Sequence, residues 1–484
     1  MNAMKRMIVA AVAAVAAVAA VLPLCAAESL ETVCSWGLPV LCVETVNHEE
    51  PRCDYVGPPE GCIGATTRNA TKVPARLTMH SPGSGELLYD SGDYVADTAG
   101  ITINIRGNTS AFVPKKPFKI KLQHKADLLL RGDEDRYKDK NWLLLYDDEL
   151  KSLLGFTVSE VVGMKWTPAF TYVNLMVNGN YRGIYMLVEQ VKRNRSCRLD
   201  CEKNGFVVEL DPYWWNEELS VKSLAFSSVY RYTFKYPEWD EVTDAQLAYV
   251  TQTMNAFDKS IAKGTYPEHI DVGSLALWLV AHEILGTWDS GGANKYFLKY
   301  DDSDTTLLEM PVLWDFDSSM QMEGDWSRLH SDIYRKFFSN TNKEFVKQWQ
   351  HCWRTLSPWV VDSLKARYAR FAESPQGHGI DISRPHDNAR WTVTNPTVGE
   401  CRQVAEAWLT VRKPWLDKHV EALYKDPCLP ADINEDGSVD VDDINIVINI
   451  MLHKHPDIYR ADVNCDMRID IDDLNAVVNA IFGG

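Results

Sequence analysis

Four polar residues in one short part of the chain could do chemistry together. Asp289 and Asn294 lie five residues apart in a Gly-bearing loop, and Asp315 and Asp317 follow a strand-like run that ends at Trp314. An acid, an amide and two further acids can gather around one divalent cation and a phosphate chain. Phosphoryl transfer needs little more from a protein than a positioned Mg²⁺ and a residue that receives the hydroxyl proton. A hydrogen-bonded surface loop would contain the same residue types, so the spacing leaves both readings open.

The elements around these residues can be predicted from hydrophobic periodicity. A helical pattern over residues 272–285 leads into the first loop, and strand-like runs at 295–300 and 310–314 follow it. The five-residue spacing of Asp289 and Asn294 matches the catalytic loop of protein kinases, and Asp315-Phe-Asp317 resembles the Asp-Phe-Gly motif.

The residues that precede these loops alternate as strands do. Ile101 to Arg106 and Phe118 to Leu122 are two such runs, and Lys119 and Lys121 leave the second run on one face. Lysines on that face would suit nucleotide phosphates, or they could belong to a solvated edge strand. A β-hairpin over 170–188 carries Glu189 at its end. Helical patterns dominate after residue 244, so we expect a β-rich front half, a helical back half and a cleft between them.

Length and charge limit the possible classes. A chain of 484 residues predicts two or three domains, and the net charge of −17 argues against a nucleic-acid partner. Residues 429–484 hold 12 acidic against 3 basic residues, so more than half of the excess charge lies there.

The first 27 residues resemble an export signal. Lys5 and Arg6 precede an apolar run from Met7 to Leu24, and Cys25-Ala26-Ala27 resembles a cleavage site; an uncleaved anchor is the alternative. We expect a secreted or cell-surface protein with no other membrane segment. The other ten cysteines suggest disulfides, for which the pairs 53–62, 197–201, 352–401 and 428–465 are candidates. Residues 28–75 show no clear periodicity and are predicted to be an irregular, cysteine-containing extension.

Six motifs in order make residues 76–424 resemble the spore-coat-protein-H (CotH) kinase family. They are Ile105 to Ser110, Lys115 to Leu122, Asn178 to Gln190, Phe206 to Asp211, Thr287 to Asp289 and Leu313 to Asp317. The resemblance implies an α+β fold: a two-lobed atypical protein-kinase-like domain with a β-rich N-lobe and a helical C-lobe, which binds ATP and Mg²⁺.

The resemblance also implies roles for individual residues. Asp289 would be the catalytic acid-base residue, Asn294 would assist the metal, and Asp315, or else Asp317, would bind Mg²⁺. Lys121, with Lys119 as the second choice, would neutralise nucleotide phosphates. Arg106 would approach the nucleotide and Glu189 would contact the base from the hinge. Glu160 is a guess for the ion-pair glutamate of the first helix.

The acidic tail contains a repeated pattern of oxygen ligands. Two twelve-residue loops, thirty residues apart, carry these ligands at positions 1, 3, 5, 7, 9 and 12, with position 7 contributing its backbone carbonyl. The first set is Asp432, Asn434, Asp436, Ser438, Asp440 and Asp443, and the second is Asp462, Asn464, Asp466, Arg468, Asp470 and Asp473. Hard oxygen ligands at these intervals select Ca²⁺.

With an apolar helix after each loop, residues 429–484 resemble a type I dockerin. This implies a small all-α calcium-binding domain and, as partner, the cohesin module of a scaffold protein such as that of a cellulosome. Val441, Asp442, Ile471 and Asp472 match the positions that face a cohesin.

Two function classes follow. One is a secreted, ATP- and Mg²⁺-dependent kinase-like protein that phosphorylates Ser or Thr of an exported protein. The alternative is a non-catalytic scaffold or carbohydrate-associated component of a dockerin–cohesin assembly, for which the aromatic cluster Tyr213-Trp214-Trp215 could stack on sugar rings. A glycoside hydrolase is a third class, but no carboxylate pair stands out for it.

Overall fold

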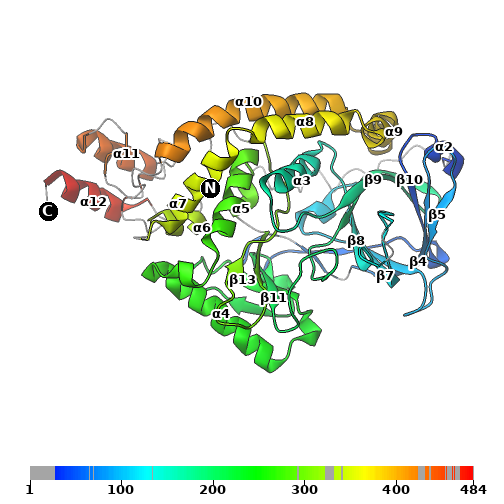
Figure 1. The fold of residues 1–484 in the computed structure, drawn as a ribbon, viewed down its shortest axis with the longest axis horizontal. Coiled ribbons are helices and arrows are strands. Elements are labelled where there is room, and N and C mark those ends of the chain that lie inside the picture. Colours follow the sequence, from blue (N-terminus) through cyan, green and yellow to red (C-terminus); the bar gives the residue numbers. More distant parts are fainter. Residues whose placement is uncertain are drawn as a thin grey trace.

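A computed structural model gives the fold of most of the chain (Figure 1). It describes residues 28–64, 66–68, 70–132, 135–291, 294–321, 332–339, 342–422, 431–434, 438–452, 454, 461, 463 and 469–482. The predicted export signal, Cys428 and Cys465 lie outside the described residues. So do five of the predicted calcium ligands: Asp436, Asp462, Asn464, Asp466 and Arg468.

The strand-rich part of the molecule is a sheet that closes on itself. Seven strands form a hydrogen-bonded ring in the order β1-β9-β10-β8-β7-β6-β4, because β4 pairs with β1 as well as with β6, and β5 adds to β4. The strands are β1 (Val40–Thr45), β4 (Val73–His80), β5 (Leu87–Asp90), β6 (Ile101–Ile105), β7 (Phe118–Ala126), β8 (Asp139–Leu145), β9 (Phe170–Val177) and β10 (Asn180–Glu189). The alternating isoleucines predicted from the sequence have their side chains inside this ring: Ile101, Ile103 and Ile105 are buried in its core.

The prediction that residues 28–75 are irregular is wrong for part of that range. Val40, Leu41 and Val43 are fully buried in β1, which pairs in parallel with β9 and antiparallel with β4. Short helix α2 (Leu30–Cys34) precedes β1, and β2 (Asp54–Val56) pairs with β3 (Thr66–Arg68). The apolar run of β1 is only four residues long, Val40 to Val43, which is too short to show a clear period, so its pairing in the tertiary structure reveals it.

A second sheet and most of the helices form the rest of the described residues up to 422. The sheet has the order β12-β13-β11-β14-β15, made of β12 (Ser220–Lys222), β13 (Arg231–Tyr236), β11 (Phe206–Asp211), β14 (Lys295–Lys299) and β15 (Leu308–Glu309). The helices are α3 (Lys151–Val162), α4 (Asp244–Lys263), α5 (Val272–Leu285), α6 (Asp332–Ser339), α7 (Glu344–Leu356), α8 (Val360–Ala372), α9 (Pro375–Trp391) and α10 (Val398–Ala422). In Figure 1, α8 and α10 run side by side along one edge, and α4 lies on the opposite edge.

Helix α5 leads directly into the loop that carries Asp289 and Asn294. Asp271 caps its N-terminus through the Gly273 N–H, and Gly286 ends it at φ +60°. A Cβ on Gly286 would lie 2.3 Å from the Trp408 ring, so only glycine lets the helix end pack this closely on α10. The residues that follow, Thr287 to Asp289, therefore start from a rigid point.

Helix α9 connects the helical part of the molecule to the closed sheet through ion pairs and hydrogen bonds. Lys115, 6% exposed, forms ion pairs of 2.6 Å with Asp148 and 2.9 Å with Asp387 of α9. Asp387 also accepts the Ile184 N–H of β10 at 3.1 Å. One hydrophobic core contains residues of β10 as well as of α5 and α10, so the two parts pack as one body.

The expected α+β class, with a β-rich N-terminal region and a helical C-terminal region, is confirmed. The last two described helices, α11 (Val441–Met451) and α12 (Ile471–Phe482), pack on each other around a small core of their own. The eight cysteines of the described residues are unbridged thiols, so the pairs 53–62, 197–201 and 352–401 are not formed. No described helix is long and apolar enough to cross a membrane.

Candidate functional site

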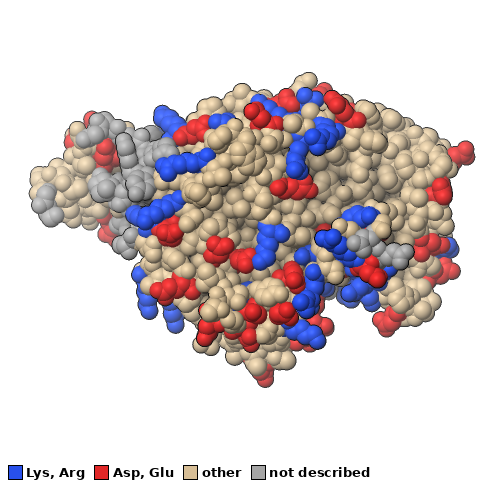
Figure 2. All heavy atoms as spheres, in the orientation of Figure 1, with Lys and Arg blue, Asp and Glu red and all other residues tan. Residues whose placement is uncertain are grey.

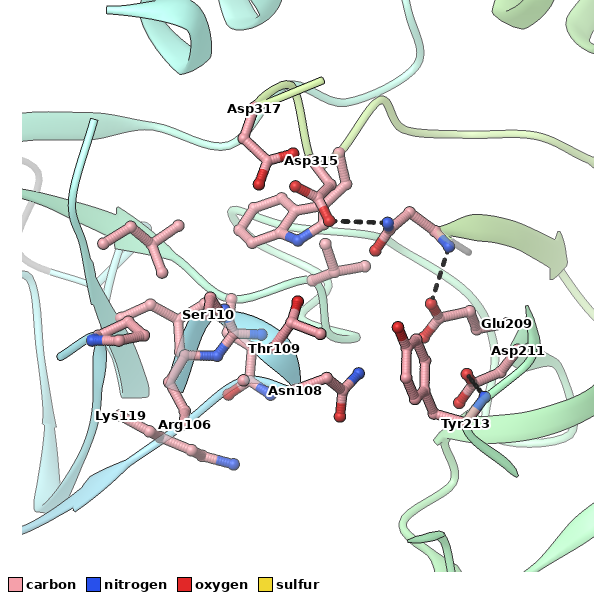
Figure 3. Close-up of a pocket in the computed structure, with 18 of the residues that line it drawn as sticks. Arg106, Asn108, Thr109, Ser110, Lys119, Glu209, Asp211, Tyr213, Asp315 and Asp317 are labelled. Atoms are coloured by element: carbon pink, nitrogen blue, oxygen red, sulfur yellow. Dashed lines mark hydrogen bonds between the residues drawn. The ribbon is translucent and has the colours of Figure 1, made fainter. Parts of the chain in front are cut away.

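The four acidic and amide residues of the two loops share one cavity with the basic side chains of Arg106, Lys119 and Lys235. The cavity has a volume of about 480 Å³ and lies between the closed sheet and the second sheet. Asp289, Asn294, Asp315 and Asp317 line it, and so do Arg106, which directly follows β6, and Lys119 of β7. Figure 3 shows Asp315 and Asp317 on one side of the cavity and Arg106 on another. These residues span more than 200 positions of the chain, and six of the residues proposed from sequence thus share one space.

A hydrogen bond joins the two loops at their polar residues. The Asn294 Nδ2 donates to Asp315 Oδ2 at 2.9 Å, and both residues have a left-handed backbone with φ +67°. Such conformations are strained for residues other than glycine and persist only where surrounding structure imposes them. Asn294 is held from a second side, because its backbone N–H donates to Glu209 Oε1 at 3.1 Å.

Negative charge is crowded at Asp315. Its side chain is exposed to solvent at the wall of the cavity, and protein groups surround it on the other sides. Desolvation, followed by repulsion from Asp317 and Asp289, raises its pKa to about 7, and Arg106 opposes the shift. A divalent cation would offset this excess of charge. No group of three or more His, Cys, Asp or Glu side chains among the described residues is arranged as a metal cage. Mg²⁺ commonly takes only one or two carboxylates and completes its shell with water and phosphate, so the carboxylates present fit it.

Phe316 fixes the position of both flanking acids. Its ring, 1% exposed, packs edge-on against Phe156 at 5.3 Å and stacks near His282 of α5 at 6.2 Å. A Cβ on Gly155 would lie 2.2 Å from this ring, so α3 touches Phe316 at its one glycine. Lys151 of the same helix donates to the Asp317 carbonyl at 3.1 Å.

The Asp289 loop is tied to the same segment. The Asp289 N–H donates to the Ser318 hydroxyl at 3.2 Å, and the hydroxyls of Thr287 and Ser319 are 2.9 Å apart. The positions of Asp289 and Asp315 are therefore coupled through residues 318 and 319.

The opposite side of the cavity is basic and lacks local compensation. Within the described part of the chain, neither the Arg106 nor the Lys119 side chain forms a hydrogen bond or a close ion pair. Burial lowers the pKa of Lys119 to about 8, followed by repulsion from Lys192, Lys121 and Arg106, while Glu238 opposes the shift. An anion placed between these side chains and the carboxylate-bound cation would satisfy both.

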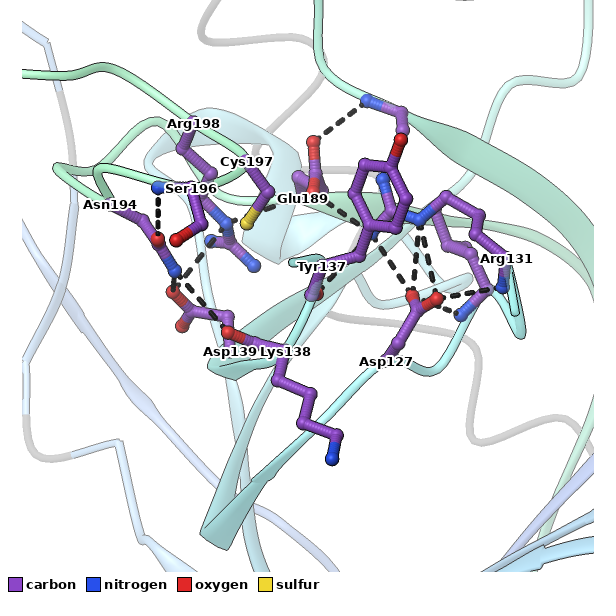
Figure 4. Close-up of polar contacts among 12 residues, drawn as sticks. Asp127, Arg131, Tyr137, Lys138, Asp139, Glu189, Asn194, Ser196, Cys197 and Arg198 are labelled. Carbon is purple, nitrogen blue, oxygen red and sulfur yellow. Dashed lines mark hydrogen bonds and ion pairs between the residues drawn. The ribbon is translucent and has the colours of Figure 1, made fainter. Parts of the chain in front are cut away.

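Two residues that the sequence analysis proposed for nucleotide binding do not line the cavity. Lys121, the preferred phosphate lysine, is exposed and does not line the cavity, whereas Lys119 does. Glu189, 1% exposed, accepts the Ala169 N–H at 3.0 Å and pairs with Arg131 at 3.1 Å (Figure 4), so it is not available to a base. Its neighbours Gln190 and Val191 line the cavity instead.

The guess that Glu160 pairs with a phosphate lysine is also wrong. Its carboxylate is half exposed on the outer side of α3 and pairs with Arg367 at 2.8 Å.

Sequence reasoning assigned no role to a second acidic group in the cavity. Glu209 and Asp211 of β11 both line it, and Glu209 pairs with Lys235 of β13 at 3.1 Å. Burial, together with repulsion from Glu209, raises the pKa of Asp211 to about 7. The sequence did contain a sign of this acidic pair. Two carboxylates that stand two residues apart in an otherwise apolar strand lie on one face, and that face needs polar surroundings.

The aromatic cluster after β11 is not an open platform. Trp215 is 8% exposed, Tyr213 lines the cavity, and the Arg231 guanidinium covers the Trp214 ring at 3.6 Å. On the face drawn in Figure 2 acidic and basic side chains are interspersed, without a continuous basic surface.

In the tail, the described ligand positions of the two loops are alike. Asp443 and Asp473 are both fully buried at the start of their helices and accept the backbone N–H of Asp440 and Asp470 at 3.0 and 2.9 Å. Asp443 also accepts the N–H of Ile433 at 2.6 Å. These contacts hold the last residues of each loop, as far as they are described, to the acid at position 12.

Comparison with protein families identifies a match. The family described as CotH kinase protein matches residues 103–374, which is more than half of the chain. The matched range contains Arg106, Lys119 and all four polar residues of the two loops. No curated protein matches the chain.

Proposed function

The chain belongs to the CotH kinase protein family, and from that premise we propose that it binds ATP with Mg²⁺ in the cavity and phosphorylates a Ser or Thr hydroxyl of a protein. The carrying observation is that Arg106 and Lys119, which lack close ionic partners among the described residues, line the same cavity as the carboxylates of Asp315 and Asp317. A polyphosphate with a divalent cation supplies the charges that both sides lack.

The residues of the cavity would have two binding roles, one toward Mg²⁺ and one toward the phosphates. Asp315 and Asp317, with the Asn294 amide beside them, would hold Mg²⁺, and Arg106 and Lys119 would bind the phosphates. Mg²⁺ neutralises the charge that develops on the phosphate oxygens. A lysine with a pKa near 8 gains in protonation when the phosphates arrive, because an opposite charge favours its ionised form.

Asp289 would receive the proton. In the proposed step the acceptor hydroxyl oxygen forms a bond to the γ-phosphorus and the bond from that phosphorus to the bridging oxygen of ADP breaks. The hydroxyl proton passes to the Asp289 carboxylate, and Ser318 and the end of α5 hold the backbone of Asp289 in place.

Incubation with labelled ATP and Mg²⁺ tests this. We expect label transfer to a Ser- or Thr-bearing protein, its loss in Asp289→Asn, and no change in the matched surface variant Asp240→Asn. Transfer that survives Asp289→Asn would contradict the assigned role. A Mg-ATP-dependent thermal shift without any transfer would indicate a nucleotide-binding protein that has no turnover. No thermal shift would refute the nucleotide site itself.

For the tail we propose a calcium-binding dockerin that attaches an exported protein to a cohesin. The support is the repeated ligand spacing and the equivalent burial of Asp443 and Asp473. The described ligands Asp432, Asn434, Ser438, Asp440 and Asp470 carry the oxygen atoms that Ca²⁺ prefers.

Calorimetric titration of the chelator-treated protein with Ca²⁺ should give two binding events. The double variant Asp440→Ala and Asp470→Ala should lose both and leave Mg-ATP binding intact. Absence of Ca²⁺ binding to the unmodified protein would refute the dockerin. Export is tested separately, by sequencing the N-terminus of the protein recovered outside the cells; a start at or near residue 28 is expected.

A further inference from the structure

Lys295 is a charged residue that lies entirely inside the protein, directly after Asn294. Its ammonium Nζ donates a hydrogen bond to the Ser290 carbonyl at 3.2 Å. The ammonium also lies 5.7 Å from the centre of the Tyr230 ring, within the range of a cation–π contact. Burying a charge costs free energy that an apolar side chain of the same length would not cost, so we expect a role for this lysine beyond packing.

The hydrogen bond from Lys295 closes the loop next to both of its functional residues. Ser290 directly follows Asp289, and Lys295 directly follows Asn294. The backbone of Lys295 is itself fixed, because it begins β14 and pairs with Leu210 of β11. The Ser290 carbonyl is therefore tied to a strand of the second sheet, and this tie limits how far Asp289 can move.

A second donor reaches the same carbonyl. The Tyr334 hydroxyl of α6 donates to the Ser290 oxygen at 3.2 Å, and Tyr334 is fully buried. Its ring lies beside Trp278 of α5, with 6.1 Å between the ring centroids. The Ser290 carbonyl is thus held from two elements, β14 and α6.

Asn294 has contacts of its own that do not involve the Lys295 side chain. Its N–H donates to Glu209 at 3.1 Å, and its side-chain amide donates to Asp315 at 2.9 Å. Loss of the Lys295 ammonium would therefore loosen the other end of the loop, where Asp289 lies. The proposed Mg²⁺ ligands would keep their positions.

We propose that Lys295 is a positioning residue for phosphoryl transfer: it holds the Ser290 carbonyl and thereby keeps the Asp289 carboxylate where the proton of the acceptor hydroxyl arrives. Lys295 does not line the cavity, so it acts through the loop and not by touching the phosphates. The inference rests on the proposed function of Asp289 and adds the residue that fixes its position.

Steady-state kinetics and Mg-ATP titrations test the proposal. Lys295→Met keeps the length of the side chain and removes the donor. We expect kcat to fall about 10- to 100-fold, the effect of a misplacement of about 1 Å at a reacting group. The KM for ATP and the dissociation constant of Mg-ATP should stay unchanged, because Asn294 keeps its bonds to Glu209 and Asp315.

Lys299→Met is the matched control. Lys299 is 6% exposed in the same strand, β14, and its ammonium donates to the carbonyl oxygens of Ser303 and Thr306. The variant thus removes the same group from a turn that lies at the other end of the strand from Asp289. We expect its kcat to equal that of the unmodified protein.

Tyr334→Phe keeps the proposal testable if Lys295→Met does not fold. It removes only the hydroxyl that donates to Ser290. We expect a smaller fall of kcat than in Lys295→Met, because a neutral hydroxyl forms a weaker hydrogen bond than an ammonium group. Unchanged kcat in Tyr334→Phe would contradict the claim that the Ser290 carbonyl holds Asp289.

The outcomes separate this inference from the proposed function. Unchanged kcat in Lys295→Met, or an equal fall in Lys299→Met, would overturn the role of Lys295 and leave the kinase activity standing. Absence of transfer by the unmodified protein would overturn both claims. Amide hydrogen exchange gives a readout besides activity: residues 287–291 should exchange faster in Lys295→Met than in Lys299→Met, and equal rates would show that Lys295 does not hold the loop.

Discussion

The contact between Gly155 of α3 and Phe316 offers a sharp test of how the site is held. In Gly155→Ala the new Cβ would lie 2.2 Å from the Phe316 Cγ and 2.4 Å from both Cδ atoms. Carbon atoms attract at about 3.5 Å, so the ring must move by roughly 1.3 Å. Phe316 is flanked by Asp315 and Asp317, and its displacement would move both carboxylates away from Asn294 and Asp289.

The expected effects on stability and on activity differ. Overpacking costs about 1–3 kcal/mol, and alanine in place of glycine within a helix returns about 1 kcal/mol, so the free energy of unfolding falls by about 0–2 kcal/mol. A misplacement of about 1 Å at reacting groups lowers the rate on the order of 100-fold. We therefore expect Gly155→Ala to fold, to melt slightly earlier, and to lose most phosphoryl transfer and Mg-ATP affinity.

Melting curves and Mg-ATP titrations measure the two effects side by side. Gly399→Ala is the matched control, because a Cβ there meets no atom closer than 4.0 Å, in helix α10. The double variant Gly155→Ala and Phe316→Leu should regain part of the activity, because leucine is smaller than phenylalanine and leaves room for the alanine Cβ. Full activity in Gly155→Ala would refute the argument that Phe316 positions the two acids.

Three further predictions concern charges in the cavity. Glu209→Leu removes the acceptor of the Asn294 N–H and a partner of Lys235; it should weaken Mg-ATP binding by about tenfold, and an unchanged dissociation constant would contradict this positioning role. Because the folded-state pKa of Asp315 is raised to about 7, the metal-free protein binds more protons than the unfolded chain between pH 4 and 7 and loses stability as pH rises through that window. Mg²⁺ should therefore raise the melting temperature more at pH 8 than at pH 6, and an equal shift would argue against Asp315 as a ligand. Lys119→Met should lower the affinity for Mg-ATP and tripolyphosphate at least tenfold while Lys121→Met leaves it unchanged, and the reverse order would restore Lys121 as the phosphate lysine.

Several elements follow from the sequence because short-range chemistry decides them. Asp271 and Gly286 cap α5 as the helical pattern implies, and the alternating isoleucines of β6 point into the core. The hairpin of β9 and β10 turns at Asn178-Gly179, where both residues have positive φ. The wrong predictions involve long-range pairing: β1 joins the closed sheet through partners that lie 30–40 residues away in β4 and 134 residues away in β9.

The sequence by itself determined the residue types that the site contains and which of them share a strand face. A period of two residues separates Glu189 from Gln190 and groups Lys119 with Lys121, but it does not say which face meets a cavity or where along the strand the cavity ends. Only the packing of the closed sheet against β11 and α5 decided that Lys119 and Gln190 reach the cavity, that Glu189 is held in a buried ion-pair network, and that Glu209 supports Asn294. Such contacts join segments that lie far apart in the chain, so no local pattern encodes them.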